Sequence, residues 1–286
     1  MMENTVKKLL FDTNALYRLS EDRSFYPKLC KRINKEYEIV VAPLVLVESM
    51  TRALSSKSFC EQHIRYAFLK LKEFSPKILL DQDELIKTVA INGNNYFSTN
   101  ANWSLVVNHM NRCYYKNDDK QGEDLYYKTK NGERRIYAYN WRWVRQNWET
   151  QYQTDWNTML SSIGTFKNKT QKIAFANNLL NTPTWNNVIL NIFQQRSGHQ
   201  VTPSNQTQIL DFMKYIGAEY QNIWYSALVN GYHPYSNRNK NDYNDMHLLL
   251  YPSLPDVYLI SFDTNMLKRV ASVNTLGKII NGFSFV

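Results

Sequence analysis

The same short motif occurs near both ends of this chain, each time at the end of an apolar run. FDTNALYR covers residues 11–18 and FDTNMLKR covers residues 262–269, and the two agree at six of eight positions. In both copies an acid, Asp12 or Asp263, separates the apolar run from a segment of helical composition. Short buried strands that alternate with helices form parallel sheets, so the motif favours an α/β fold with both acids at carboxyl ends of strands.

The sequences diverge on both sides of the motif, which argues against an internal duplication. We interpret the repeat as one geometric requirement that is met twice. An acid leaves the strand tip, and a Thr or Asn caps the helix that follows. Thr13 could cap the first helix.

Other apolar and β-branched runs extend this alternation of strands and helices. Pro43 suits the first turn of the helix after the second strand, and that helix carries Glu48 near its amino end. Asp242 and Asp245, three positions apart, share one face of a helix that Pro252 and Pro255 end. The expected strands are 7–11, 38–41, 257–260 and 279–286, the last with a bend or bulge at Gly282, and the expected helices near them are 13–20 and 25–35.

Strands in parallel sheets end at a common edge, where ligands bind. Asp12, Glu48 and Asp263 are expected to converge there, with Asp245 from the start of a helix. Carboxylates gathered in this way repel one another unless cations neutralise them, and Mg²⁺ or Mn²⁺ are the cations that prefer such oxygen ligands. The chemistry of such a site is phosphodiester hydrolysis.

A plainer alternative is that the acids only cap helices, where the helix dipole favours a negative charge. Ser261 and Thr13 could hold a metal-bound water or orient an acid, or they could make local turn hydrogen bonds. Asp256, which precedes a strand, is assigned to turn chemistry, and His247 is expected to be mainly structural.

These motifs resemble those of the PIN-domain nucleases. In that family an acid follows the first strand in a D-T-N type motif, a Glu opens a helix after the second strand, a third acid starts a later helix, and a fourth follows the next strand, often two residues after a Ser or Thr. The resemblance covers roughly residues 5–60 and 238–286. The matching residues are Asp12, Glu48, Asp245 and Asp263, with Ser261 before the last acid, Asp242 as an extra acid, and Asn14 as a brace for the Asp12 turn.

The resemblance implies a three-layer α/β sandwich with a central, mainly parallel sheet. It also implies a metal-dependent endoribonuclease, with RNA preferred over DNA. Asp12, Glu48, Asp245 and Asp263 would be catalytic, and the same four acids with Asp242 would bind Mg²⁺ or Mn²⁺. The role as a toxin, a phage-defence effector or an RNA-processing enzyme is left open.

Glu48 and Asp245 are 197 positions apart, too far for a simple connection between strands. We therefore expect residues 1–60 and 238–286 to form the nuclease domain and residues 61–237 to form a mainly helical insertion. Residues 116–132 are charged and contain glycines, as in an exposed loop or hairpin tip. The helices expected in the insertion are 60–73, 82–91, 139–160, 171–180, 184–195 and 206–229.

A formal charge of +9 favours an anionic partner, most commonly nucleic acid. Within 128–145, basic residues alternate with aromatic ones, as in single-strand binding surfaces. The candidate contacts are Arg134, Arg135, Arg142 and Arg145. The alternative is that the aromatic residues form the core of the insertion, since Trp141, Val144, Trp148, Tyr152 and Trp156 recur at helical spacing.

Several other classes of protein are disfavoured. Three cysteines without CxxC spacing argue against a disulfide framework or a zinc site, and the longest apolar run, 39–47, is too short to span a bilayer. We expect a cytoplasmic protein that does not bind membranes. A non-catalytic nucleic-acid-binding or scaffold protein with a PIN-like fold remains the alternative. A haloacid-dehalogenase-like phosphatase is less favoured, because that family has Asp where this chain has Asn14.

Overall fold

The structure is a computed structural model. It describes residues 6–21, 24–46, 48–49, 60–92, 96–97, 125–128, 134–137, 149–150, 153–154, 156–158, 161, 166–233 and 242–285. The description below concerns these residues.

A parallel sheet of five strands in the order β3-β2-β1-β6-β7 forms the centre of the fold. The inner strands are rich in Leu, Ile and Val, and the last three residues of each are buried, as expected for strands covered on both faces. The sheet confirms the predicted α/β fold. Its strands are β1 (Lys7–Phe11), β2 (Tyr37–Val41), β3 (Lys77–Ile78), β6 (Val257–Ser261) and β7 (Ile279–Asn281).

The strand order reverses between β1 and β6. From β1 the chain continues to β2 on one side, through α1 (Thr13–Glu21) and α2 (Phe25–Glu36). From β6 it continues to β7 on the other side, through α12 (Thr264–Arg269). In open parallel sheets the crevice beyond the carboxyl ends of two such strands is the usual ligand site.

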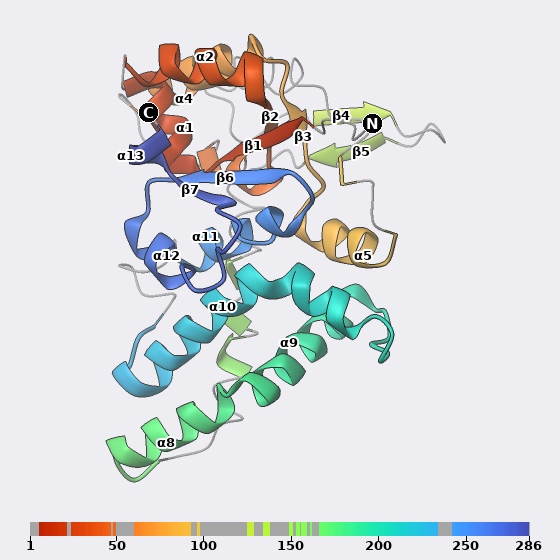
Figure 1. Cartoon of the computed structure of the whole chain (residues 1–286), viewed down its shortest axis with the longest axis vertical. Helices are drawn as coiled ribbons and strands as arrows, with labels where there is room; N and C mark the ends of the chain where they lie inside the picture. Colours follow the sequence, from red (N-terminus) through yellow and green to blue (C-terminus); the bar gives the residue numbers. More distant parts are fainter. Residues whose placement is uncertain are drawn as a thin grey trace.

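Helices cover both faces of the sheet, which gives three layers (Figure 1). α1, α2 and α4 (Cys60–Lys72) lie on one side, and α1 packs against both of the others. α10 (Gln206–Asn230), α11 (Asp242–Leu248) and α12 lie on the other side, where α10 contacts α11, α12 and the short 3-10 turn η1 (Tyr251–Ser253).

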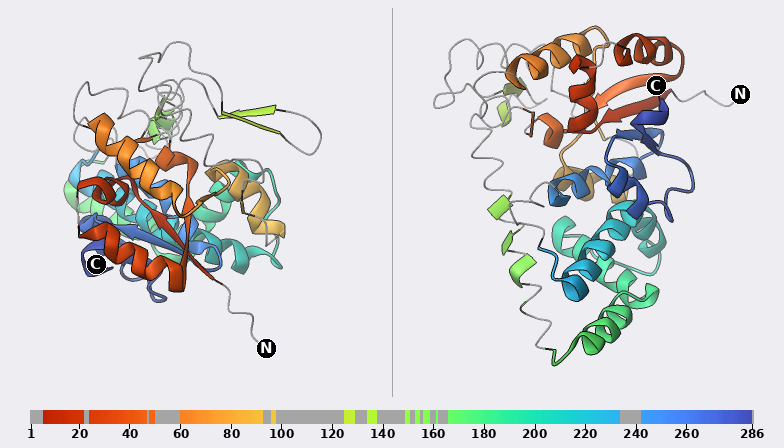
Figure 2. Two further views of the ribbon diagram at one scale, coloured as in Figure 1. Left: turned by 90° about the horizontal axis from the view of Figure 1, so that it is seen from above. Right: turned by 90° about the vertical axis from the view of Figure 1, so that its left-hand side faces the viewer.

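The helices of the central part of the chain lie next to α10. α8 (Lys169–Leu179) and α9 (Thr182–Ser197) both pack on it, and α5 (Gln82–Asn92) contacts α9 (Figures 1 and 2). Together with α4, these four helices confirm five of the predicted helices to within about two residues at each end. Of the predicted helix 139–160, the described residues from 149 onward are helical.

Two β elements lie inside the stretch expected to be a mainly helical insertion. β3 is one edge of the central sheet, so the sheet extends past residue 60. β4 (Leu125–Lys128) pairs with β5 (Arg134–Tyr137) as an antiparallel hairpin. The rest of the expected loop or hairpin tip, 116–124 and 129–132, lies outside the described residues. The division into a nuclease domain and an insertion stays a prediction.

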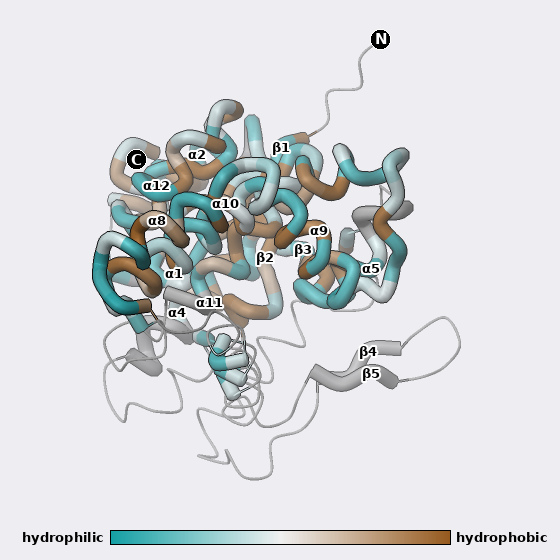
Figure 3. The backbone as a smooth tube through the Cα atoms, turned by 90° about the horizontal axis from the view of Figure 1, so that it is seen from below, coloured by the Kyte–Doolittle hydropathy of each residue, from teal (hydrophilic) through white to brown (hydrophobic). Residues whose placement is uncertain are grey.

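A continuous hydrophobic core joins the sheet to both helical layers. Figure 3 shows hydrophobic stretches of the backbone around β2, toward the middle of the molecule. In the helical layer around α10, called the lower layer below, Trp156 is fully buried, and its ring lies 4.6 Å from that of Trp224 on α10. None of the helices in the described ranges is long and apolar enough to cross a lipid bilayer.

The predicted last strand, 279–286, is too long. β7 ends at Asn281, and Gly282–Phe285 form a short terminal helix, α13. The Asn281 side chain accepts a hydrogen bond from the Phe283 amide, which turns the backbone out of the strand. Gly282 is needed here because a Cβ atom at this position would lie 2.4 Å from the Phe262 ring. The glycine therefore permits close packing and begins the helix.

Candidate functional site

Asp12 is the central acid at the carboxyl edge of the sheet. It directly follows β1, only 5% of its surface is exposed, and its amide donates to the Ile260 carbonyl of β6 at 3.1 Å. Its Oδ1 accepts a hydrogen bond from the Ala15 amide at 2.6 Å. Thr13 therefore does not cap α1: the acid itself is the cap, because its carboxylate accepts from the amide of the third residue of the helix.

Thr13 instead holds a second acid. Its hydroxyl donates to Oε2 of Glu48 at 2.5 Å, and both side chains are buried. Glu48 lies in the helical stretch that begins at Pro43, as the sequence predicted. The hydrogen bond joins segments that follow two neighbouring strands, β1 and β2, and it fixes the position of the Glu48 carboxylate beside Asp12.

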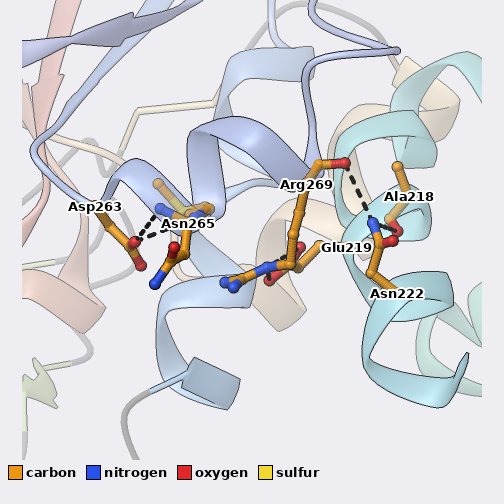
Figure 4. A network of polar contacts seen from close by, with 7 residues as sticks. Ala218, Glu219, Asn222, Asp263, Asn265 and Arg269 are labelled. Carbon is orange, nitrogen blue, oxygen red and sulfur yellow. Dashed lines mark hydrogen bonds and ion pairs between the residues drawn. The ribbon is translucent and has the colours of Figure 1, made fainter. Parts of the chain in front are cut away.

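Ser261 connects Asp12 to the third acid. The Ser261 side chain is completely buried, and its hydroxyl hydrogen-bonds to the Asp12 carboxyl group and accepts from the Asp263 amide at 3.0 Å. Asp263 in turn caps α12, since its Oδ1 accepts from the amides of Asn265 and Met266 at 2.8 and 3.1 Å (Figure 4). Both copies of the FDTN motif thus use the acid as the helix cap.

Burial and neighbouring charges act together on Asp12. Loss of water contact raises the pKa of its carboxyl group to about 6, and the charges of Glu48 and Asp263 raise that pKa as well. The hydrogen bonds from Ser261 and Ala15 lower the pKa but do not outweigh burial. Three acids from separate parts of the chain therefore lie within electrostatic range of one another.

Capping explains only part of this arrangement. It accounts for one oxygen each of Asp12 and Asp263, and a cap is favoured when it is ionised. It does not account for Glu48, which lies within its helical stretch and is held by a buried hydroxyl. It also does not explain why Asp12 is placed where ionisation is unfavourable. Perturbed carboxyl groups of this kind are typical of functional sites.

The other predicted acids lie on α11. The helix spans Asp242–Leu248, as expected, and Asp245 is half-buried on it, whereas the Asp242 side chain lies outside the described residues. His247 on the same helix is buried, and its Nε2 lies 3.5 Å from Nη1 of Arg196 on α9, which fits a structural role. Asn14 is exposed, and the Asp12 turn is held by the Ala15 amide.

The predicted basic residues are placed only in part. Arg134 and Arg135 belong to β5, opposite Lys128 and Tyr127, and Arg142 and Arg145 lie outside the described residues. Trp156 packs in the core of the lower layer, as the alternative interpretation predicted for it. Nucleic-acid contact by the four arginines stays a prediction.

Sequence reasoning missed an ion pair between α10 and α12. Glu219, only 1% exposed, accepts hydrogen bonds from Nε of Arg269 at 2.6 and 2.9 Å. The Asn222 side chain donates to the Arg269 carbonyl at 3.2 Å, so α10 holds the end of α12 opposite to Asp263 (Figure 4). The sequence contains one signal of this ion pair: Glu219 is an acid on the buried face of a long amphipathic helix, and buried acids are usually paired.

The donor set suits a hard divalent cation. Carboxylate oxygens are the ligands that Mg²⁺ and Mn²⁺ prefer. The hydrogen bonds that Asp263 accepts from backbone amides engage only its Oδ1. Across the described ranges, no three His, Cys, Asp or Glu side chains lie at the spacing of a metal site. Asp242, one of the expected ligands, is not among the side chains described.

No protein-family model, curated protein or solved structure matches the chain. Its function is therefore inferred from the local chemistry and from the place of the acids in the fold. Asp12 and Asp263 follow β1 and β6, the two strands between which the strand order reverses. Glu48 joins them from the segment after β2.

Proposed function

We propose that this chain is a divalent-metal-dependent nuclease of the PIN type that hydrolyses phosphodiester bonds in RNA. The observation that carries the proposal is the position of Asp12, buried at the strand-order reversal and influenced by the charges of both Glu48 and Asp263. Selection for stability alone would not place three carboxylates together there, because their mutual repulsion destabilises the folded state. A bound cation would reverse that cost.

In this proposal Asp12, Glu48 and Asp263 hold Mg²⁺ or Mn²⁺, with Asp245 and Asp242 contributing from α11. When bound, such ions polarise a water molecule and stabilise the oxygens that enter and leave the phosphate. Thr13 keeps the Glu48 carboxylate in place, and Ser261 does the same for Asp12. A pKa of about 6 leaves Asp12 mostly ionised at neutral pH, in the form that binds a cation.

The PIN-like assignment and the preference for RNA depend on the resemblance. Two features support them: the order of the acids along the chain, and the five-stranded parallel sheet whose edge brings three of them together. A role as a toxin, defence effector or processing enzyme fits the same chemistry.

A non-catalytic nucleic-acid-binding or scaffold protein is the second candidate. The observation that favours it is the capping role of Asp12 and Asp263, which gives both acids a structural function. A haloacid-dehalogenase-like phosphatase is less well supported, since Asn14 occupies the position of its second Asp and is exposed.

The test is cleavage of end-labelled RNA and DNA of the same sequence by purified protein with Mg²⁺, Mn²⁺ or EDTA. We expect RNA cleavage that EDTA abolishes. Asp12→Asn and Asp263→Asn should each lower the rate by about 10²–10³-fold, because each removes a charge that stabilises the transition state through the cation. Either variant retains an oxygen that can cap its helix.

Asp256→Asn is the matched control. Asp256 lies in the turn before β6, at the opposite end of that strand from Asp263, and its φ of 57° is one that Asn adopts readily. This variant should cleave like the wild type. Unchanged cleavage by Asp12→Asn and Asp263→Asn would instead show that the acids are structural caps.

A further inference from the structure

A cation and two aromatic rings form a cluster at the carboxyl edge of the sheet. The rings of Phe262 and Phe283 meet edge to face, with centroids 4.9 Å apart. The guanidinium carbon of Arg18, on α1, lies 5.3 Å from the Phe262 centroid and 6.0 Å from that of Phe283. Both distances are within the range of cation–π attraction. We call these three residues the Phe283 cluster.

The cluster is held in a fixed arrangement. The Phe25 ring of α2 packs against Phe262, with centroids 5.9 Å apart, and Gly282 lets the backbone of α13 lie directly against the Phe262 ring. The Asn281 side chain anchors the Phe283 amide. An aromatic ring that is already fixed loses little conformational entropy when a ligand binds to it.

Phe283 nevertheless remains largely open to solvent, with 60% of its surface exposed. Single exposed apolar residues are ordinary, and Leu276 at 65% is one example. Phe283 differs from Leu276 in lying on a rigid aromatic support beside a guanidinium group.

The cluster also adjoins the acids. Phe262 lies between Ser261 and Asp263 in the chain, and α13 follows β7 as α12 follows β6, at the same end of the sheet. In Figure 1 the labels α1, α12 and α13 lie at this end, which faces the viewer in the right-hand view of Figure 2. A polymer bound at the acids would therefore pass close to Phe283.

Arg18 supplies the charge that such a polymer needs. Among the described residues no acid forms an ion pair with Arg18, and the overall charge of the chain is +9. A guanidinium group presents several N–H donors in a geometry that matches a phosphate. Positive charge next to an open aromatic ring is the combination that binds single-stranded nucleic acid.

We propose that the Phe283 cluster binds an unpaired nucleotide next to the acidic site, with the base stacked on Phe283 and a phosphate held by Arg18. The proposal rests on the proposed nuclease function for the identity of the ligand. It narrows the substrate to single-stranded segments, because a base within a duplex has no face available for stacking. Stacking on an aromatic ring does not distinguish ribose from deoxyribose, so the cluster would accept RNA and DNA alike.

The test is binding rather than cleavage, with the full chain in EDTA so that no substrate is cut. The probes are a single-stranded RNA, a single-stranded DNA of the same sequence, and the corresponding duplexes. Phe283→Ala should weaken binding of both single strands by roughly 5- to 150-fold, the usual contribution of one stacked base, and leave duplex binding unchanged. Phe283→Trp should retain or strengthen single-strand binding, since indole offers a larger ring.

Arg18→Gln and Leu276→Ala complete the set. Arg18→Gln should reduce the slope of log K against log salt by roughly 0.7, as expected for one lost phosphate contact on a single strand, whereas Phe283→Ala should leave the slope unchanged. Leu276→Ala removes a comparably exposed apolar side chain on the loop before β7 and should have no effect. Thermal melts of all variants in EDTA establish that they are folded.

The possible results separate this inference from the proposed function. Single-strand binding by Phe283→Ala within twofold of wild type would overturn the cluster as a binding site, even if the protein cleaves RNA. Equal losses for single strands and duplexes, or no binding by the wild type, would overturn it too. If Phe283→Ala weakens single-strand binding while Asp12→Asn cuts like wild type, the cluster stands and the catalytic assignment fails.

Discussion

At the scale of single residues, one carboxyl group works against the stability of the fold. Asp12 is buried between two other acids, and its pKa rises from 3.8 to about 6. Its folded-state pKa is therefore higher than its unfolded-state pKa, so the protonated form favours folding. That contribution is complete below pH 3.8 and is lost as the pH rises toward 6.

Asp12→Asn should remove this pH dependence. In EDTA the variant should be as stable as wild type near pH 4 and more stable above pH 6, by about 3 kcal/mol, because the amide is neutral at every pH. Urea denaturation at intervals from pH 4 to 7.5 measures the difference. Parallel stability curves for the two proteins would mean that ionisation of Asp12 costs nothing.

At the scale of elements, the ion pair between α10 and α12 connects the lower helical layer to the acidic edge. Asp263 caps the start of α12 and Arg269 is its last residue, so a rotation of this short helix would move the acid. Glu219 and Asn222 on α10 hold its final residue through the side chain and the carbonyl. The position of Asp263 therefore depends on a helix whose residues lie 33 to 57 positions earlier in the chain.

Arg269→Met tests this connection. The substitution keeps most of the length of the side chain but removes the cation from a Glu219 carboxylate that is 1% exposed, and it should cost about 3–5 kcal/mol of stability. Replacing both Glu219 and Arg269 by Met should recover most of that loss, since no buried charge is left.

Urea denaturation of the single and double variants gives the comparison. The control is Lys214→Met, which breaks an ion pair with Asp211, an acid that is 74% exposed, and should change stability by less than about 1 kcal/mol. A loss that small for Arg269→Met would show that the buried pair does not hold α12 in place.

The elements also show how far sequence reasoning extends. The strands ending at Phe11, Val41 and Ser261 were predictable to within a residue, because each is a short apolar run ended by a change in composition. β3 was missed because two residues, Lys77–Ile78, are too short to show any periodicity. The glycine at 282 signalled a bend or bulge, but the sequence does not show that the Phe262 ring packs against it.

The same limit applies to the site. The acids were predictable because they follow recognisable strands, whereas the roles of Thr13 and Ser261 depend on partners 35 and 249 positions away. Short-range patterns cannot choose between a local cap and a distant carboxylate when the same hydroxyl can reach both. Burial decides between them, and it becomes known only with the fold.

At the scale of the whole molecule, a cation bound at the acids would stabilise the entire fold by mass action. Mg²⁺ or Mn²⁺ at 100 times its dissociation constant should add about 2.7 kcal/mol. For a chain of this size that corresponds to a rise of roughly 4–5 °C in the melting temperature. Thermal melts with metal, followed by excess EDTA to reverse the shift, measure the effect.

The Asp12→Asn variant distinguishes stabilisation by an ion bound at the acids from stabilisation by an ion bound elsewhere. It should start from a higher melting temperature without metal and gain little from adding it, because the central ligand is gone. Equal gains in wild type and variant would place the ion elsewhere on the protein.

The place of β1 in the sheet has a consequence for the order of events during synthesis. β1 leaves the ribosome long before its neighbour β6, which begins 246 positions after Phe11. At about 5–20 residues per second, β1 waits on the order of 10–50 s for that neighbour. Until then the nascent chain carries Asp12 and Glu48 without Asp263. For the proposed nuclease, the cutting site would be assembled only after Asp263 has been synthesised, so the growing chain could not cut its own messenger before that point.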